Sequence, residues 1–237
     1  EYLGFRPWSG EGKVMGHAAY GDPKRYLDAF RRIIHPAKGG GFEVDMSYFR
    51  YHVRFWREWV SQKFIDQFGP PREPEGALDE RHKDIAAALQ AVSEEIGIHL
   101  ADELQRMTGE QNLCLAGGVA LNCVMNGKIL RESRFRDVFV QPMANDAGTS
   151  LGAALYVHHV LLGHPRAMKL QTIALGPQFD NDAIEAALRR HPVVWHRSAD
   201  VAREAAALLA DGKIIGWFQG RMEVGPRALG HRSILGD

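Results

Sequence analysis

The segment 112–154 constrains the fold more than any other part of the sequence. A short apolar run ends at Gly117 and Gly118, and an apolar pattern with helical spacing follows these glycines. A second apolar run at 137–140 leads through a polar loop into the apolar segment 151–160. Strand, glycine turn, helix, strand and helix in this order predict an α/β fold with an open sheet.

The glycine turn predicts a site for a phosphate or a nucleotide. Adjacent glycines at a strand end let the backbone turn sharply and approach a ligand closely. The following helix offers unpaired N–H groups and the positive end of its dipole, which favour an anion. Ligands of open α/β sheets bind beyond the carboxyl ends of the strands. A plain strand-to-helix turn explains Gly117 and Gly118 equally well, because glycine motifs alone are weak signals.

A carboxylate stands at the end of the second predicted strand. Asp146 follows Asn145 and precedes another glycine-led helix. A carboxylate in this position can bind a metal or position a hydroxyl group. The alternative is that Asp146 only caps the helix.

A dense block at 219–233 follows the predicted buried strand 213–218. It contains Arg221, Arg227 and Arg232 together with a serine and several glycines. The guanidinium group matches phosphate and carboxylate oxygens in a bidentate fashion, and glycine and proline favour a loop. The block therefore predicts a loop that cradles an anion, although a basic surface turn would have a similar composition.

Composition excludes several classes of protein. Apolar residues make up 45% of the 237 residues, which is enough for a packed core, and 29 basic residues balance 29 acidic ones. No net field attracts the chain to nucleic acid or to a membrane surface. No segment of the given sequence is apolar enough to cross a bilayer, and none has the pattern of a signal peptide. Cys114 and Cys123 fit no metal spacing, so a reducing, cytoplasmic setting is expected.

The rest of the chain predicts the following elements. The glycine-rich segment 10–21 predicts a loop, either an ordinary surface loop or one that approaches a ligand. Asp84 is predicted to cap a long helix that ends at Gly109, after an exposed charge run at 79–83. Other expected elements are helices at 26–34, 180–190 and 199–210, strands at 42–49 and 193–195, a helical aromatic stripe within 51–68 that serves the core, and a linker at 161–176.

Four blocks of the sequence resemble the NodU/CmcH carbamoyltransferases, a family that forms O-carbamoyl groups on nodulation factors, aminoglycosides, cephalosporins and ansamycins. They occur in the family's order and cover nearly the whole chain. The blocks are 12–21 (GKVMGHAAYG), 115–122 (LAGGVALN), 141–154 (QPMANDAGTSLGAA) and 220–235 (GRMEVGPRALGHRSIL).

The resemblance implies two domains. Residues 1–170 would form the second lobe of an actin-like ATPase domain, related to sugar kinases and to the RNase H-like fold. Residues 171–237 would begin a YrdC-like α/β domain that is truncated at the end of the sequence. We therefore expect the chain to be an internal piece of a longer protein.

The resemblance also implies an activity and a set of site residues. The YrdC-like part would join carbamoyl phosphate to ATP, giving carbamoyl adenylate and pyrophosphate. The actin-like part would pass the carbamoyl group to a hydroxyl of a sugar or polyketide. The implied residues are Arg221, Arg227 and Arg232 for the phosphate and carbamoyl contacts, Lys13, Gly16, Gly117, Gly118, Asn122 and Ser233 for the cofactor, and Asp146 for a divalent metal such as Fe²⁺.

The segment is incomplete as an enzyme under this interpretation. The family's paired histidine ligands are absent, since no His-x-x-x-His spacing occurs here. Asp146 would then be one ligand among several, and the nucleotide pocket of the truncated domain would lack strands. We expect the isolated segment to bind ligands weakly and not to turn over.

Two other functions compete with the carbamoyltransferase. Another actin-like ATPase, either a sugar kinase or a tRNA threonylcarbamoyl-transfer enzyme, shares the glycine turn. A kinase has no use for the arginine block, and the neutral charge disfavours a tRNA substrate. A non-catalytic scaffold is the third alternative. The sequence does not name the acceptor, and it leaves the oligomeric state open, a homodimer included.

Overall fold

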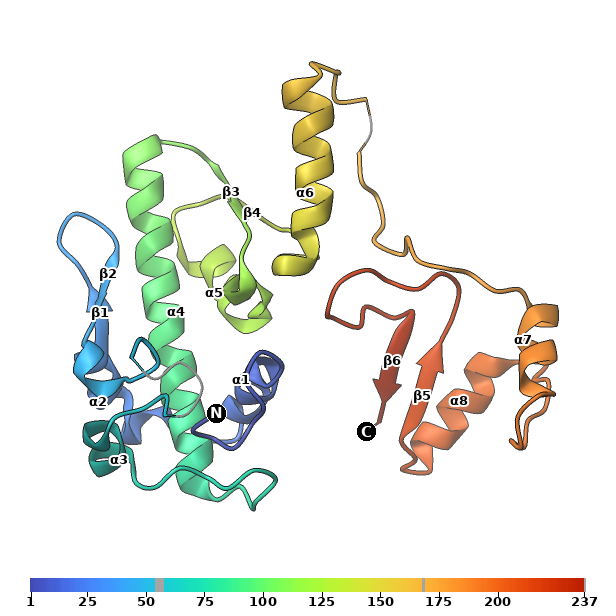
Figure 1. The fold of residues 1–237 in the computed structure, drawn as a ribbon, viewed down its shortest axis with the longest axis horizontal. Coiled ribbons are helices and arrows are strands. Elements are labelled where there is room, and N and C mark those ends of the chain that lie inside the picture. The colour runs from blue at the N-terminus through green and yellow to red at the C-terminus, as the bar shows by residue number, and fades with distance from the viewer. Residues whose placement is uncertain (54–57, 168, 237) are drawn as a thin grey trace. The chain divides into compact units, whose positions relative to one another are not determined.

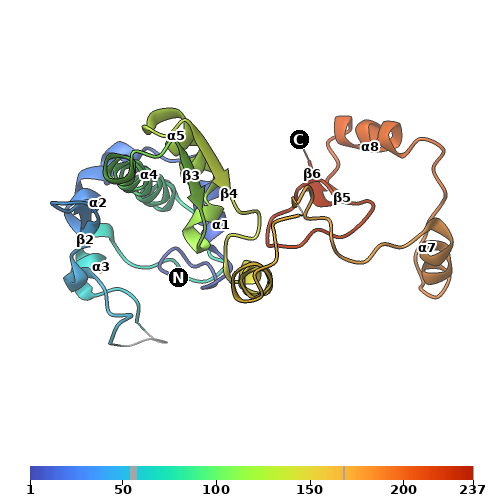
Figure 2. The same cartoon turned by 90° about the horizontal axis from the view of Figure 1, so that it is seen from above.

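The computed structural model of the chain describes residues 1–53, 58–167 and 169–236. The protein is a mixed α/β chain that divides into two compact units, Glu1–Gln141 and Pro142–Asp237. Figures 1 and 2 show helices and small two-stranded sheets in both units. The mixed α/β prediction is confirmed, whereas the actin-like lobe, the YrdC-like domain and the boundary at 170 stay predictions.

The long helix α4, Glu80–Thr108, organises the first unit (Figure 1). Helices α1 (Glu11–Ala18), α2 (Leu27–Ile33) and α5 (Cys123–Glu132) all contact it. Its buried face packs with the aromatic side chains of α3, Gln62–Phe68. Buried residues at helical spacing explain why this face turns inward. The main core cluster includes Phe30, Ile33, Phe64, Phe68, Ile85 and Val92.

Helix α4 begins one turn earlier than the sequence predicts. Asp79 is its N-cap, and the Asp79 carboxylate accepts a hydrogen bond from the N–H of His82 at 3.0 Å. Asp84 lies inside the helix instead of capping it. Its carboxylate is buried and accepts hydrogen bonds from the N–H of Asp22 at 2.8 Å and from Arg25 at 3.2 Å. The predicted end is confirmed, because Gly109 adopts the left-handed conformation that closes helices.

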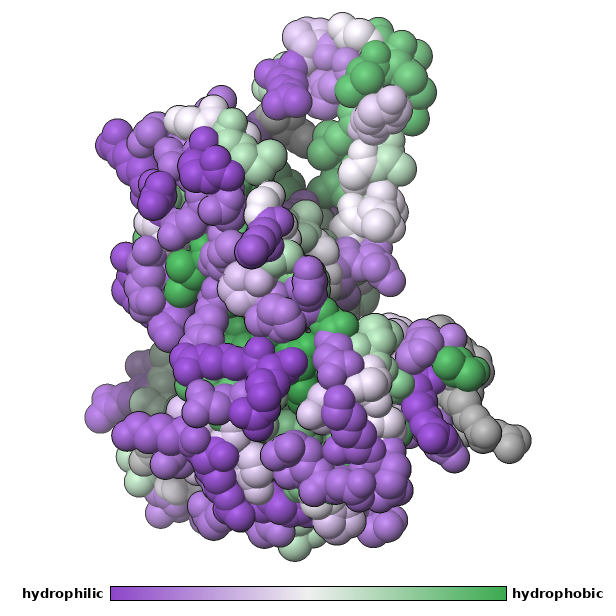
Figure 3. Space-filling view, turned by 90° about the vertical axis from the view of Figure 1, so that its left-hand side faces the viewer, coloured by the Kyte–Doolittle hydropathy of each residue, from purple (hydrophilic) through white to green (hydrophobic). Residues whose placement is uncertain are grey.

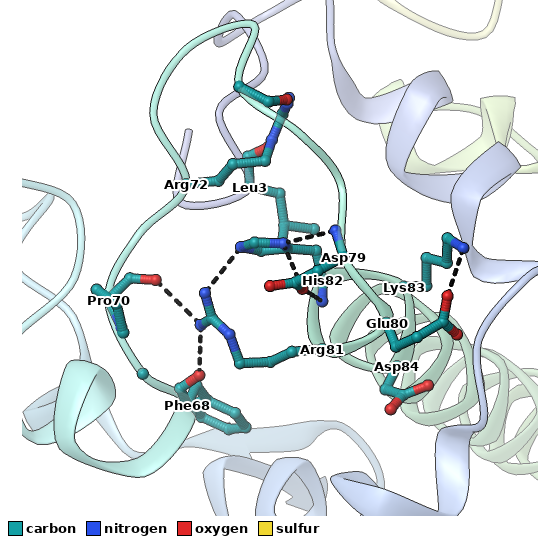
Figure 4. Close-up of polar contacts among 12 residues, drawn as sticks. Leu3, Phe68, Pro70, Arg72, Asp79, Glu80, Arg81, His82, Lys83 and Asp84 are labelled. Carbon is teal, nitrogen blue, oxygen red and sulfur yellow. Dashed lines mark hydrogen bonds and ion pairs between the residues drawn. The ribbon is translucent and has the colours of Figure 1, made fainter.

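The charge run at 79–83 is only partly the exposed surface that the sequence predicts, because Asp79 and Glu80 are exposed whereas His82 is buried. Figure 4 shows Arg81 donating hydrogen bonds to the carbonyl oxygens of Phe68 and Pro70. A second guanidinium nitrogen of Arg81 lies 2.8 Å from Nε2 of His82, whose side chain is buried. These charged groups connect the start of α4 to the chain that follows α3. The pattern of charges within 79–83 alone does not predict these contacts.

Because His82 is buried, we expect the stability of the protein to depend on pH. Nε2 of His82 lies 2.8 Å from a guanidinium nitrogen of Arg81, which can only donate, and Nδ1 lies 2.6 Å from the Asp79 carboxylate and 3.3 Å from the backbone N–H of Asp79. Burial lowers the pKa of His82 below 6.5, and Arg81 and Arg72 lower it further, which outweighs the opposing effect of Asp79. Protonation would place a second positive charge against Arg81.

We expect the melting temperature of the full-length protein to fall as the pH drops below about 6.5, the unfolded value for histidine. The stabilising contribution of neutral His82 is fully present above that pH and is lost toward its lower folded pKa. Calorimetry at about pH 7.5 and 5.5 on the unmodified protein and on His82→Gln measures this effect. An equal fall in both proteins would show that other groups cause it.

The first unit contains two small sheets. Strands β1 (Ile34–Pro36) and β2 (Phe42–Val44) pair antiparallel, and β3 (Asn112–Leu115) and β4 (Asp137–Val140) pair parallel. Helix α5 provides the crossover between β3 and β4, as the sequence predicts. A second core cluster lies beside this βαβ unit and consists of Ala101, Leu113, Met125, Ile129 and Phe135.

Three local predictions for the first unit are wrong. Segment 10–21 forms helix α1 over most of its length instead of a loop. The strand predicted at 42–49 stops at Val44, because Asp45 caps a short 3-10 turn. In the aromatic segment only 62–68 is helical among the described residues. Phe55 and Trp56 lie outside the described residues.

The second unit contains α6 (Thr149–Tyr156), a π-helical turn at Val157–Leu161, α7 (Asn181–Leu188), α8 (Val201–Ala210) and the antiparallel strands β5 (Ile215–Phe218) and β6 (Arg232–Leu235). The strand predicted at 193–195 does not form, and Val194 there is fully exposed. The apolar surface at the top of Figure 3 belongs to the end of α6 and the following turn. No helix in the described parts of the chain is long and apolar enough to cross a membrane.

Candidate functional site

The glycine turn between β3 and α5 has a backbone that only glycine adopts without strain. Gly117 has φ +105° and ψ 161°, a region that is essentially closed to other residues. Gly118 then begins a 3-10 turn, Gly118–Leu121, and Asn122 caps α5. A Cβ atom added at Gly117 or Gly118 would meet no atom within 4 Å. The outer side of the turn is therefore open, and a ligand could approach the backbone there.

The side chain of Asn122 joins this turn to α4. Its Oδ1 accepts a hydrogen bond from the N–H of Met125 at 3.0 Å, and its Nδ2 donates to Gln90 at 2.8 Å. Gln90 donates in turn to the buried carboxylate of Glu94 at 2.7 Å, and Lys128 lies 2.9 Å from the same carboxylate. Asn122 thus holds the start of α5 in place, and its predicted contact with a nucleotide stays a prediction.

Replacement of Asn122 by alanine should lower the free energy of unfolding by about 1–2 kcal/mol, because it removes the N-cap and the pairing with Gln90. Denaturant unfolding of the full-length protein measures the change. Asn126→Ala in the same helix is a comparison, since the side chain of Asn126 makes a single described hydrogen bond, to the carbonyl of Ala120. A smaller loss for Asn122→Ala than for Asn126→Ala would contradict the capping role.

The structure brings two of the predicted cofactor segments together. Lys13 and Gly16 lie on α1, and Met15 between them places its sulfur 4.0 Å from the sulfur of Cys123 at the start of α5. Lys13 is exposed, and Gly16 has open space where a Cβ would lie. A basic side chain therefore lies on a helix that packs beside the first turn of α5, although the direct contacts of Lys13 and Gly16 with a nucleotide stay predictions.

Asp146 begins a 3-10 turn, Asp146–Gly148, that leads into α6. It is exposed, and Oδ1 of the neighbouring Asn145 is buried without a hydrogen-bond partner in the described structure. No group of three or more His, Cys, Asp or Glu side chains in the described residues could hold a metal ion. These residues do not form a metal site, and Asp146 could at most complete one whose other ligands come from elsewhere.

The arginine block forms a loop between β5 and β6 whose turns depend on glycine, since Gly220, Gly225 and Gly230 have positive φ angles. Glu223 lies at its centre and is only 4% exposed. One carboxylate oxygen, Oε1, accepts hydrogen bonds from the N–H groups of Leu229 at 2.8 Å and His231 at 3.0 Å. The loop is thus closed around a buried carboxylate.

The three arginines of the block have different surroundings. The guanidinium of Arg221 donates to the carbonyl oxygens of Gly176 at 3.1 Å and Leu175 at 3.3 Å. Arg232 donates to the carbonyl of Gly225 and has its Nε 3.7 Å from Oε2 of Glu223. Arg227 is partly buried. Only Arg232 of the three lines the pocket described next.

An open pocket of about 470 Å³ lies against β5 and β6. Its lining includes Trp217 and Phe218 of β5 and Arg232 and Ser233 of β6. Trp217 and Ser233 are direct partners across the two strands. Phe218 and Arg232 are the next pair, and because successive strand residues face opposite sides of a sheet, their side chains share the face opposite to Trp217 and Ser233. An aromatic ring and a cation on one face suit a small planar anion. Two of the four predicted residues of this block therefore meet at one pocket.

Sequence reasoning missed Glu223 as part of this site. The usable signal was a single acidic residue between arginines in a glycine-rich loop, because a carboxylate there must either pair with an arginine or bind backbone N–H groups. In the structure the Glu223 carboxylate accepts hydrogen bonds from backbone N–H groups and also lies close to Arg232.

Comparisons with known proteins identify the family. Residues 1–155 match the family model described as the carbamoyltransferase N-terminus, and residues 206–237 match the carbamoyltransferase C-terminus. The chain belongs to the carbamoyltransferase family, and the resemblance stated from the sequence is confirmed.

Several relatives support this assignment. The chain is 44% identical to the uncharacterized protein sll1178 of Synechocystis over its whole length, covering 40% of that protein. It is 41% identical to the nodulation protein NolO of Bradyrhizobium diazoefficiens over 96% of the chain and 40% of NolO. It is 36% identical to the 3'-hydroxymethylcephem-O-carbamoyltransferase of Streptomyces clavuligerus over 65% of the chain and 28% of that enzyme. The chain spans less than half the length of each relative.

Proposed function

We propose that these residues belong to an O-carbamoyltransferase that uses carbamoyl phosphate and ATP to carbamoylate a hydroxyl of a sugar or another natural product. The observation that carries the proposal is that the chain matches both family models, and that the block 220–235 forms a pocket lined by Arg232 and Ser233. Relatives named as nodulation proteins and a cephem O-carbamoyltransferase support a small-molecule acceptor.

The proposed chemistry has two stages. Carbamoyl phosphate and water give carbamate and phosphate, and a carbamate oxygen then attacks the α-phosphorus of ATP, so that pyrophosphate leaves and carbamoyl adenylate remains. An acceptor hydroxyl next attacks the carbamoyl carbon, loses its proton and releases AMP. Each completed turnover therefore yields one phosphate, one pyrophosphate and one AMP.

The residues at the pocket suit the first stage. The guanidinium of Arg232 provides a fixed cation for phosphate or carbamate oxygens. Phe218, the partner of Arg232 across the two strands, supplies an apolar surface for a planar carbamoyl or adenine group. This pocket belongs to the part of the chain that we propose to be YrdC-like.

The glycine turn suits the second stage. The open outer side of Gly117 and Gly118, the N-terminus of α5 and the nearby helix that carries Lys13 support nucleotide binding in the part that we propose to be actin-like. We propose Asp146 as one ligand of a divalent metal. No step is derived through that metal, because the described residues do not assemble its site.

The proposal is tested by pyrophosphate release. The full-length protein is incubated with ATP, with and without carbamoyl phosphate, in the presence of Fe²⁺, and pyrophosphate and phosphate are measured together. We expect release that requires carbamoyl phosphate, with the two products in equal amounts. Hydrolysis of ATP to ADP without a requirement for carbamoyl phosphate would instead indicate an actin-like ATPase of another kind.

A further inference from the structure

Glu223 is the most enclosed charged residue of the second unit in the described structure, and the proposed function gives it no role. Its side chain is 2% exposed, although it lies in a loop whose neighbours Met222 and Leu229 are well exposed. A buried carboxylate is costly unless it is paired or hydrogen-bonded. Its position therefore depends on the particular groups that surround it.

The two oxygens of Glu223 have different surroundings. Oε1 accepts hydrogen bonds from the N–H groups of Leu229 and His231 and so fixes the backbone of the loop. Oε2 has no hydrogen bond in the described structure and faces Nε of Arg232 at 3.7 Å. Nε of Arg232 is likewise buried and without a hydrogen bond. The two unsatisfied atoms are thus opposite charges that face each other within ion-pair range.

Arg232 is held from two sides. Its Nε faces Glu223, and its Nη2 donates to the carbonyl of Gly225. The side chain also lines the pocket beside β5 and β6. The remaining nitrogen, Nη1, has no described partner within the protein and is the donor left for a ligand.

We propose that Glu223 is a positioning residue for anion binding. It holds the guanidinium of Arg232 by its charge, while its other oxygen fixes the loop, so that phosphate or carbamate oxygens meet a donor that is already oriented. The inference rests on the proposed function, and it adds a residue that acts through Arg232 without touching the ligand. Preorganised charge of this kind is more effective than a mobile side chain, because little reorganisation is needed on binding.

The ionisation of Glu223 is consistent with this role. Burial raises the pKa of its carboxyl, but the N–H groups of His231, Leu229 and Arg232 outweigh that effect and hold the pKa below the ordinary value. Glu223 is therefore anionic at neutral pH, and the charge that faces Arg232 is present under the conditions of the reaction.

A double-mutant cycle tests the proposal on the full-length protein. Glu223→Gln keeps an oxygen that can accept the N–H groups of Leu229 and His231 but removes the charge. Arg232→Lys keeps the charge but has no group at the position of Nε. Titration calorimetry measures the affinity for carbamoyl phosphate and for inorganic phosphate in the two single variants and the double variant.

We expect each single substitution to weaken carbamoyl phosphate binding about tenfold or more, and the double substitution to weaken it little beyond the larger single effect. Non-additive losses are the signature of a residue that acts through another. Melting temperatures are measured for every variant, because a purely structural role would lower stability without coupling to Arg232. Glu204→Gln, which neutralises an exposed carboxylate on α8 that contacts His196, is the matched control.

The outcomes separate the inference from the proposed function. If the unmodified protein binds carbamoyl phosphate and Glu223→Gln binds it equally well, or if the two losses add, the positioning role is wrong while the proposed function stands. If the unmodified protein does not bind carbamoyl phosphate, both are wrong. If Glu223→Gln does not fold, Glu223→Asp replaces it in the cycle, because the shorter side chain withdraws the charge from Arg232 yet remains an anionic acceptor.

Discussion

Replacement of Arg232 by alanine should reduce carbamoyl-phosphate-dependent pyrophosphate release by about 100-fold or more. Arg232 is the arginine of the block 219–233 that lines the pocket against β5 and β6 in the described structure, where Ser233 is also a lining residue. Loss of one preorganised donor to a developing negative charge typically costs two to three orders of magnitude. Steady-state pyrophosphate release by the full-length protein at saturating ATP measures the effect.

Two further variants make this result specific. Arg190→Ala removes a guanidinium on the surface of the same unit, which contacts a carbonyl of α7, and should leave the rate unchanged. Arg227→Ala tests the neighbouring arginine of the block, which is partly buried and lies outside the pocket lining. A rate that survives in Arg232→Ala but disappears in Arg227→Ala would move the anion contact to Arg227.

The βαβ unit was the most predictable part of the fold. The apolar runs before Gly117 and at 137–140 have the length and spacing of strands, and two glycines mark the turn. All of this information is local in the sequence, and the structure confirms β3, α5 and β4. Predictions of this kind succeed because neighbouring residues decide them.

The start of α4 was mispredicted because distant residues decide it. Both Asp79 and Asp84 are good N-cap residues by type, and the sequence alone does not rank them. In the structure the Asp84 carboxylate accepts hydrogen bonds from Asp22 and Arg25, about sixty positions away in the sequence. The Asp79 carboxylate instead caps the helix by accepting the N–H of His82. Contacts at that separation leave no periodic signal in the sequence.

The arginine block shows the same limit at the candidate site. The residue types correctly indicated a loop with several cations, but they could not show which arginine lines a pocket. Arg221 donates to the carbonyls of Leu175 and Gly176, more than forty residues earlier in the chain. Arg232 is positioned by Glu223 and by the pairing of β5 with β6. Only the folded backbone distinguishes these two environments.

Substitution of Gly118 by valine should weaken ATP binding by the full-length protein about 100-fold while changing its melting temperature little. The φ angle of Gly118 is not in the left-handed region, and a Cβ there would meet no atom of the protein within 4 Å. The fold therefore tolerates the side chain, whereas a phosphate at this turn would be pushed away, and small displacements at a binding site have effects of this size. Equilibrium binding of ATP and thermal unfolding are measured on the same samples.

Two other glycines distinguish ligand exclusion from backbone strain. Gly117→Ala should lower stability by about 1–3 kcal/mol, because φ +105° is strained for any residue with a Cβ. Gly127→Ala in α5 should keep ATP affinity and stability, since its new methyl meets only the flexible end of Arg131. Unchanged ATP affinity in Gly118→Val would show that the nucleotide does not lie over the turn. The open space there would then be a feature of an ordinary strand-to-helix connection.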